Sequence, residues 1–317
     1  MLEIILKNRE VIKAQSIDEI SNLNLDFNII QFIDYSKTDT EWVEKKFGLD
    51  FSIMQHYEDI EISSHFLENK NQASFHFSIP FYNNETKLVE EPIFLIMSSH
   101  GLFLFTGSGP DDFFNKTYAN KFLALHELSD RNKILRSLIE FITDYYADIT
   151  ENLTKRIKSL SNRVLIEKEF TSEDMDLITR YNFNNLLIKE SIIETTRVLT
   201  MYRKSKWEQQ IGIKDSIESE LNDLTVVSDY IQFNFDRLDD LKENITNKID
   251  LEQNHIFKIL TVATVCISLP TLVAGIYGMN FEKMPELKSA YGYPISIVAM
   301  IFSAVLPLIY FKRKKWL

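Results

Sequence analysis

Two long apolar runs dominate the pattern of hydrophobic and polar positions. The first runs from Ile259 to Tyr277 without a charged residue, and the second runs from about Pro294 to Phe311. A run of about 19 residues forms roughly 28 Å of helix, close to the ~30 Å thickness of the bilayer hydrocarbon. We therefore expect two membrane-spanning helices. The alternative is a pair of buried core helices.

The charges that flank these runs predict their orientation. Lys258 precedes the first run, and residues 312–315 after the second run are all basic. The charges of the intervening loop cancel, so the excess of Lys and Arg lies at the two outer ends. The positive-inside rule then places both termini in the cytoplasm. With no signal peptide in view, we expect about 255 residues before the first run to stay in the cytoplasm.

The segment before the apolar runs has helical periodicity. Between residues 131 and 257 there is no proline and one glycine, Gly212. Apolar residues at spacings of three and four predict helices over about 131–164, from a break near 170–172 to Lys204, and from about 213 to 277. The last helix would be roughly 98 Å long at about 1.5 Å per residue. Its apolar stripe requires neighbouring helices, as in a stalk.

The first 130 residues show the shorter periodicity of strands. We predict a helix over Thr38–Phe47, capped by Thr38 or Asp39, and turns at 83–85 and 99–101. The predicted strands are Leu2–Leu6, Asn28–Tyr35, Ile60–Leu67, Ala73–Phe81, Pro92–Ser98 and Gly101–Thr106. The chain is thus expected to be an α+β membrane protein. Its parts are an α/β domain (1–130), long helices including the stalk (131–258) and a membrane module (259–317).

Charge and composition narrow the possible partners. The formal net charge is −11, with about +5 on residues 258–317 and therefore about −16 on the rest. An acidic cytoplasmic body repels nucleic acid and attracts divalent cations. The single cysteine, Cys266, lies inside the first run. No catalytic constellation is visible, so we do not expect an enzyme.

Polar residues form a stripe along the first run and its approach. The gaps between them are 7, 3, 4 and 3, which puts them on one helical face. The face could line a water-filled path in an oligomer, or the hydroxyls could bond to their own helix or mediate dry packing. Phe257 and Leu260 lie beside this face and could form an apolar constriction. The polar residues are Asn254, Thr261, Thr264, Ser268 and Thr271.

A short motif follows the first run. Gly278-Met279-Asn280 lies within the segment 274–281, Met284-Pro285-Glu286-Leu287 follows, and the second run comes next. This arrangement resembles the CorA family of magnesium channels and transporters. The resemblance implies a funnel-shaped homopentamer in the cell membrane, with Gly278, Met279 and Asn280 as the selectivity filter for Mg²⁺ influx. A ring of Asn280 amides would accept hydrogen bonds from the water shell that Mg²⁺ keeps.

Glu282 and Glu286 follow the motif and would raise the cation concentration at the outer mouth.

The resemblance also implies regulation by Mg²⁺ bound between cytoplasmic domains. The candidates for the regulatory metal site lie near the start of the stalk helix: Asp215, Glu218, Glu220 and Asp223.

Two other hypotheses stay open. A transporter of the same superfamily could carry Zn²⁺, Co²⁺ or Ni²⁺, although the Met279-Asn280 pair favours Mg²⁺. In a different class, the chain would be a non-conducting coiled-coil sensor anchored in the membrane, against which the polar stripe argues.

Overall fold

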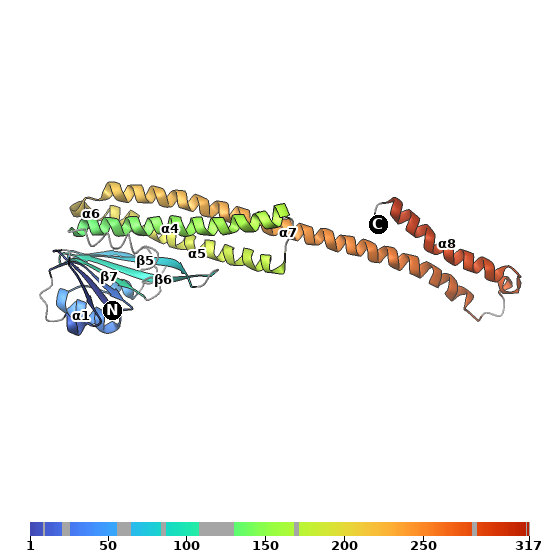
Figure 1. Cartoon of the computed structure of the whole chain (residues 1–317), viewed down its shortest axis with the longest axis horizontal. Coiled ribbons are helices and arrows are strands. Elements are labelled where there is room, and N and C mark those ends of the chain that lie inside the picture. The colour runs from blue at the N-terminus through green and yellow to red at the C-terminus, as the bar shows by residue number, and fades with distance from the viewer. Residues whose placement is uncertain are drawn as a thin grey trace. The chain divides into compact units, whose positions relative to one another are not determined.

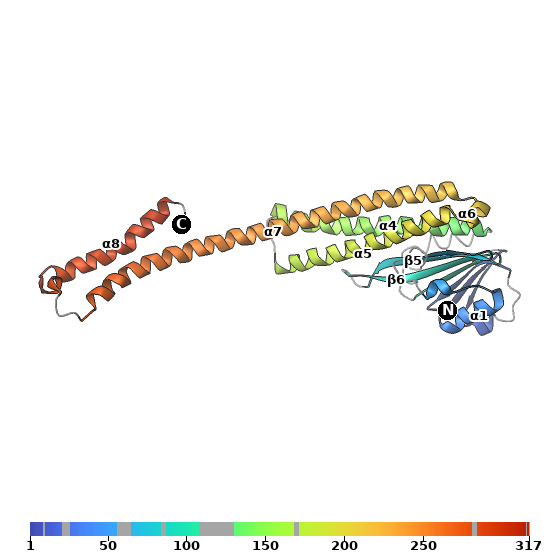
Figure 2. The same cartoon turned by 180° about the vertical axis from the view of Figure 1, so that it is seen from behind.

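The computed structural model describes residues 1–8, 10–20, 26–55, 65–83, 87–107, 130–167, 171–280, 284–314 and 316. Figures 1 and 2 show its elements from opposite sides. The chain divides into two compact units, Met1–Leu241 and Lys242–Leu317.

The described strands of the first unit form one seven-stranded sheet with the order β2-β1-β3-β7-β6-β5-β4. β3 and β7 pair in parallel, and the other neighbours pair antiparallel. Apolar side chains on β3 and β7, such as the stacked Phe32 and Phe105, build the core. The strands are β1 (Leu2–Leu6), β2 (Val11–Ala14), β3 (Phe27–Ile33), β4 (Phe66–Glu68), β5 (Gln72–Tyr82), β6 (Leu88–Ser98) and β7 (Leu102–Thr106).

Helix α1 (Lys37–Phe47) has the predicted extent but a different cap. Ser36 is the N-cap, and its backbone N–H donates to Asp39 Oδ2 at 2.7 Å in a capping box. The predicted caps Thr38 and Asp39 were therefore wrong. Asp39 acts from the first turn, where its carboxylate satisfies the cap's own N–H group.

The strand predictions differ from the structure at β2, which was not predicted, and at β6. Residues 60–64 of the strand expected over Ile60–Leu67 lie outside the described residues, as do residues 84–85 of the expected turn at 83–85. β6 begins at Leu88 and contains Pro92, which was predicted to be its first residue. Pro92 pairs with Ser78 of β5, while β7 pairs only with Phe94–Met97. Proline has no backbone N–H group to donate, and at Pro92 the strand β6 has a paired neighbour on one side only.

The helical predictions hold over long segments. α4 (Arg131–Ser161) runs into a π-helical turn at Asn162–Glu167, and α5 (Ser172–Arg203) starts after a capping box at Thr171. The short α6 (Lys206–Ile211) was not predicted; it ends at Gly212, whose φ of 75° suits glycine. The long helix α7 (Lys214–Tyr277) is continuous over 64 residues.

Hydrogen bonds fix α4, α5 and α7 to one another within the first unit. Asn234 Nδ2 of α7 donates to Thr154 Oγ1 of α4 at 2.9 Å, and Asn185 Nδ2 of α5 donates to the carbonyl oxygen of Ile231 at 2.9 Å. The side chains of Asn234, Thr154 and Asn185 are all buried. This polar layer sets the register of the three helices, because a shift would leave buried amides unpaired.

A cluster of carboxyl groups lies between β6 and α5. Ser191 Oγ donates to Glu90 Oε1 at 2.7 Å, whereas Glu194 Oε2 is buried without a hydrogen-bond partner among the described residues. Burial, followed by the charges of Glu90 and Glu190, raises the pKa of Glu194 to about 7. Burial also raises the pKa of Glu90.

We expect this cluster to make stability decline as the pH rises. Above the ordinary pKa of 4.5 the unfolded chain loses the Glu194 proton, while the native state retains it up to about pH 7. The stabilisation is complete below pH 4.5 and is lost as the pH rises through about 7. Glu194→Gln should flatten this decline, as measured by urea unfolding of the full chain in detergent. The exposed Glu173→Gln should keep it. An equal decline in Glu194→Gln would contradict the assignment.

The second unit contains the apolar part of α7 and helix α8 (Gly292–Arg313), with a 3₁₀ turn at Pro285–Lys288 before α8. Among the described residues, these two helices are long and apolar enough to cross a membrane. Their most apolar windows are only 6% buried, whereas the core helices of a soluble fold are mostly buried.

Candidate functional site

The predicted polar stripe lies on one exposed face of α7. Thr261, Thr264, Ser268 and Thr271 are all exposed in the single chain, as is Asn254 about two turns earlier. Phe257 and Leu260 are exposed beside them. A face that carries hydroxyls and exposed apolar groups needs a covering of water, lipid or protein.

The hydroxyl groups of this face bond to their own helix. Thr261 donates to the carbonyl oxygen of Phe257 at 2.8 Å, and Thr264 donates to that of Leu260 at 2.8 Å. Thr271 and Ser268 donate in the same way to Ile267 and Val265. Self-bonding was one of the alternatives that the sequence left open. Since each hydroxyl hydrogen is used, only the oxygen lone pairs face outward, and they accept hydrogen bonds.

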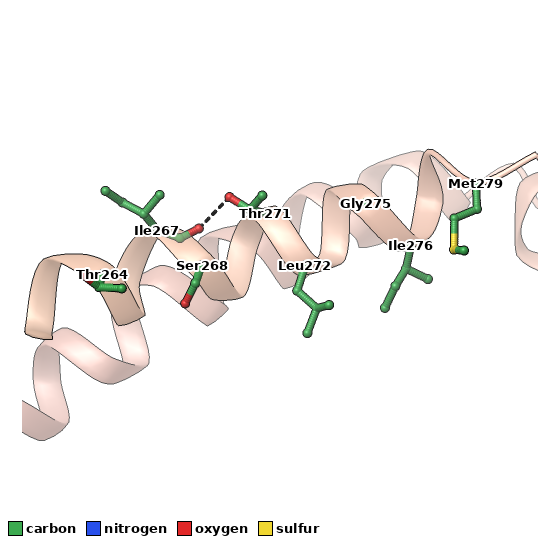
Figure 3. A pocket seen from close by; sticks show the side chains of 8 residues that line it. All are labelled: Thr264, Ile267, Ser268, Thr271, Leu272, Gly275, Ile276 and Met279. Carbon is green, nitrogen blue, oxygen red and sulfur yellow. Dashed lines mark hydrogen bonds between the residues drawn. The ribbon is translucent and has the colours of Figure 1, made fainter.

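A groove of about 780 Å³ continues this face toward the end of α7. Figure 3 shows Ser268, Leu272 and Ile276 pointing to the same side, with Met279 at one end of the groove. Sequence reasoning named the polar residues of this face and missed its apolar ones, although they recur at the same helical spacing. The missed lining residues are Ile267, Leu272, Gly275 and Ile276.

The motif lies at the end of the helix. Tyr277 is its last residue, and the Gly278 N–H group donates to the Ala274 carbonyl oxygen at 2.9 Å. The φ angle of Gly278 is not positive, so a left-handed backbone does not explain the glycine here. Space is the tighter restriction, because a Cβ atom would lie 3.1 Å from the Ala274 carbonyl oxygen. Met279 and Asn280 are exposed beyond it.

The outer-mouth carboxylates are only partly described. Glu282 lies outside the described residues, and so does the side chain of Glu286, whose backbone belongs to the 3₁₀ turn before α8.

Comparison with known proteins assigns the chain to a family. A family model described as CorA-like Mg2+ transporter protein matches residues 24–313. The chain belongs to this CorA-like family.

Relatives and solved structures agree with the family assignment. The chain is 27% identical to the magnesium transport protein CorA of Wolinella succinogenes over 323 residues, and the match covers all of both chains. It is 29% identical to the protein of the same name from Campylobacter jejuni over 332 residues, again with full coverage. The CorA magnesium transporter of Methanocaldococcus jannaschii superimposes with a TM-score of 0.77 at 18% identity, covering 100% of this chain and 99% of that one. The predicted fold class is confirmed, and the two apolar helices of this CorA-like chain are those of a membrane protein.

Among the described residues, the acidic candidates of this CorA-like chain do not form a metal-binding group within one copy. Asp215, Glu218 and Asp223 are exposed, and Glu218 lies 3.9 Å from Arg203. Glu220 is buried and accepts a hydrogen bond from Thr143 Oγ1. Burial raises the pKa of Glu220, and the carboxylates of Asp223, Glu140 and Asp144 raise it further, against the hydrogen bond from Thr143. Among the described residues, no group of three or more His, Cys, Asp or Glu side chains is placed to hold a metal ion.

Proposed function

We propose that this chain forms a homopentameric channel in the cell membrane that passes Mg²⁺ inward down its electrochemical gradient. The observation that carries this proposal is the exposed row of acceptor-only hydroxyls on α7 that leads to the exposed Asn280. Water bound to a dication points its hydrogens outward, so a wall of acceptors suits a hydrated ion. Lipid offers such a wall no hydrogen-bond donors.

Asn280 is proposed as the selecting residue. Mg²⁺ dehydrates reluctantly and keeps several waters in most sites. A ring of neutral amide oxygens, one per copy, holds those waters without stripping them. A ring of carboxylates would bind the ion more tightly and release it more slowly, which conduction disfavours. Glu282 and Glu286 would raise the cation concentration outside this ring.

Phe257 and Leu260 are proposed as the gate. Both side chains are more than half exposed in the single chain, beside the hydroxyl face and toward its cytoplasmic end. A ring of such side chains makes an apolar constriction that excludes water when it narrows. The cytoplasmic position follows from the proposed orientation, with both termini in the cytoplasm.

Cytoplasmic Mg²⁺ is proposed to close the channel through carboxylates near the start of α7. Asp215, Glu218 and Asp223 are exposed and can meet a cation at a boundary between copies. Glu220 is less suited, because it is buried and already accepts a hydrogen bond from Thr143. Repulsion between carboxylates would loosen the ring once the ion leaves.

We expect a triple variant, Asp215→Asn with Glu218→Gln and Asp223→Asn, to lose this inhibition. The internal Mg²⁺ concentration that halves uptake should rise roughly tenfold, which corresponds to about 1.4 kcal/mol of lost ion binding. The matched control carries Glu41→Gln and Glu44→Gln on α1, which also removes exposed carboxylates. An unchanged half-inhibiting concentration in the triple variant would exclude these residues as the regulatory site.

The proposed function is tested by metal uptake into liposomes that hold the purified full-length protein, with internal Mg²⁺ varied. Uptake of Mg²⁺ that slows as internal Mg²⁺ rises is expected. Preference for Zn²⁺, Co²⁺ or Ni²⁺ in competition would favour the second hypothesis. Vesicles that never admit a divalent cation would favour a non-conducting sensor.

A further inference from the structure

Two exposed stripes in the first unit have matching patterns. The α5 stripe has gaps of four, three and four residues, and the α7 stripe has gaps of three, four and three. Each contains two apolar residues and two polar or charged ones, and the described part of the chain covers neither stripe. The α5 stripe consists of Arg197, Ile193, Glu190 and Leu186; the α7 stripe consists of Asp223, Val226, Tyr230 and Phe233.

The apolar members of both stripes are exposed. Leu186 and Ile193 are 42% and 45% exposed, and Val226 and Phe233 are 54% and 63% exposed. All of them lie in helices that are otherwise packed against each other or the sheet, so their exposure is not a general property of the helices. Exposed apolar side chains that recur along one helical face are candidates for an interaction surface.

The α5 stripe faces away from the elements that α5 contacts. Thr195 meets Tyr146 of α4 at 3.0 Å, Asn185 bonds to Ile231 of α7, and Ser191 bonds to Glu90 of the sheet. These contacts occupy the other faces of α5. The two stripes of one copy therefore do not cover each other.

Contacts between α5 and α7 show which residues of the two helices lie at the same level along their axes. Asn185 lies opposite Ile231 and Asn234, while Arg203 lies 3.9 Å from Glu218. α5 and α7 therefore run antiparallel, side by side, as Figures 1 and 2 also show. Distances along each helix can be counted from the layer of Asn185 and Asn234 at about 1.5 Å per residue.

On this scale the stripes coincide pair by pair. Leu186 and Phe233 each lie one residue from the layer, and Ile193 and Val226 each lie eight residues from it, about 12 Å. Glu190 and Tyr230 lie at about 7.5 and 6 Å, and Arg197 and Asp223 at about 18 and 17 Å. Each pair is chemically complementary: two apolar pairs, a phenol opposite a carboxylate, and an arginine opposite an aspartate.

In a ring of copies, stripe residues that lie at equal levels can come into contact between neighbours. Rotation about an axis that runs along the helices moves no residue along that axis, so neighbouring copies meet at equal levels. We propose that the α5 stripe of one copy packs against the α7 stripe of the next. The contact is heterologous, as closed rings require. A groove of about 440 Å³ beside Val226 and Tyr230 leaves room for the incoming Ile193 side chain.

This inference rests on the proposed homo-oligomeric channel and specifies how its cytoplasmic parts assemble. It also places Asp223 at a boundary between copies, as its proposed regulatory role requires. Arg197 of the neighbouring copy then limits how strongly the carboxylates there repel one another.

Disulfide trapping in the full-length chain tests the contact. In a Cys266→Ser background, Leu186→Cys combined with Phe233→Cys should form a ladder of covalent oligomers larger than dimers on oxidation. Cysteines form such a bond only when their Cα atoms lie within about 7 Å. The matched control pairs Leu186→Cys with Gln232→Cys, because Gln232 is exposed but turned about 100° around α7. It should stay monomeric on a denaturing gel.

Charge exchange gives a second readout. Arg197→Asp and Asp223→Arg should each weaken the assembly, and the double exchange should restore it, as measured by native mass in detergent. A Phe233→Cys single variant that dimerises would instead show α7 against α7 and overturn the proposal. So would the absence of any ladder in a preparation that is pentameric and takes up Mg²⁺, a result that leaves the channel proposal intact. A monomeric, inactive wild-type protein would overturn both.

Discussion

Asn280→Ala is expected to abolish most Mg²⁺ uptake. Without the amide ring, the outer end of the proposed path keeps no acceptor matched to the water shell of the ion. The methyl groups offer no hydrogen bond in return for the water that the ion would have to shed. We expect uptake into liposomes to fall roughly 100-fold, equivalent to about 2.7 kcal/mol of lost stabilisation for the entering ion.

Two further variants separate selection from folding. Asn280→Asp should bind Mg²⁺ more tightly and pass it more slowly, so that uptake saturates at a lower external concentration and a lower rate. Lys288→Ala, an exposed residue of the 3₁₀ turn before α8, should change uptake by no more than about twofold, since surface charges have weak effects at physiological salt. Normal uptake by a correctly assembled Asn280→Ala channel would refute the assignment.

The long elements of this protein could be predicted because their signals add up over many residues. No breaker interrupts the apolar spacing between Gly212 and the membrane, and α7 follows the predicted span almost to the residue. The two membrane-spanning segments were equally clear, because an uncharged apolar run long enough to cross the bilayer is typical of membrane helices.

Short elements escaped prediction because their signals are local and ambiguous. β2 has four residues and α6 has six, too few for periodicity to show. At the start of α1, Ser36, Thr38 and Asp39 all have side chains that can cap a helix. The extended backbone conformation of Ser36 and its capping box with Asp39 identify it as the cap.

Several features of the candidate site could not be predicted either, because they depend on three-dimensional contacts. The hydroxyl spacing on α7 could be recognised in the sequence, but not where each hydroxyl hydrogen goes. Glu220 could not be distinguished from its exposed neighbours, because its partner Thr143 lies 77 residues away on another helix. The groove that ends at Met279 is likewise a matter of shape, and its apolar lining residues carry no polar signal.

The proposed gate leads to the second large effect. Leu260→Asn should keep the channel conducting when internal Mg²⁺ is high, because a ring of amides stays wet at a width where leucine side chains exclude water. We expect uptake under inhibiting internal Mg²⁺ to rise at least roughly tenfold, about 1.4 kcal/mol in favour of the open path. Liposome uptake at low and high internal Mg²⁺ measures this directly.

Leu260→Met is the matched control, since it keeps an apolar side chain of similar size on the same face of α7 and should remain inhibited. The comparison also separates the gate from the regulatory site. If closure acts through dewetting, Leu260→Asn conducts while internal Mg²⁺ is still bound to the cytoplasmic carboxylates. The triple carboxylate variant, by contrast, conducts because the ion no longer binds. Full inhibition of Leu260→Asn by internal Mg²⁺ would place the gate elsewhere along the helix.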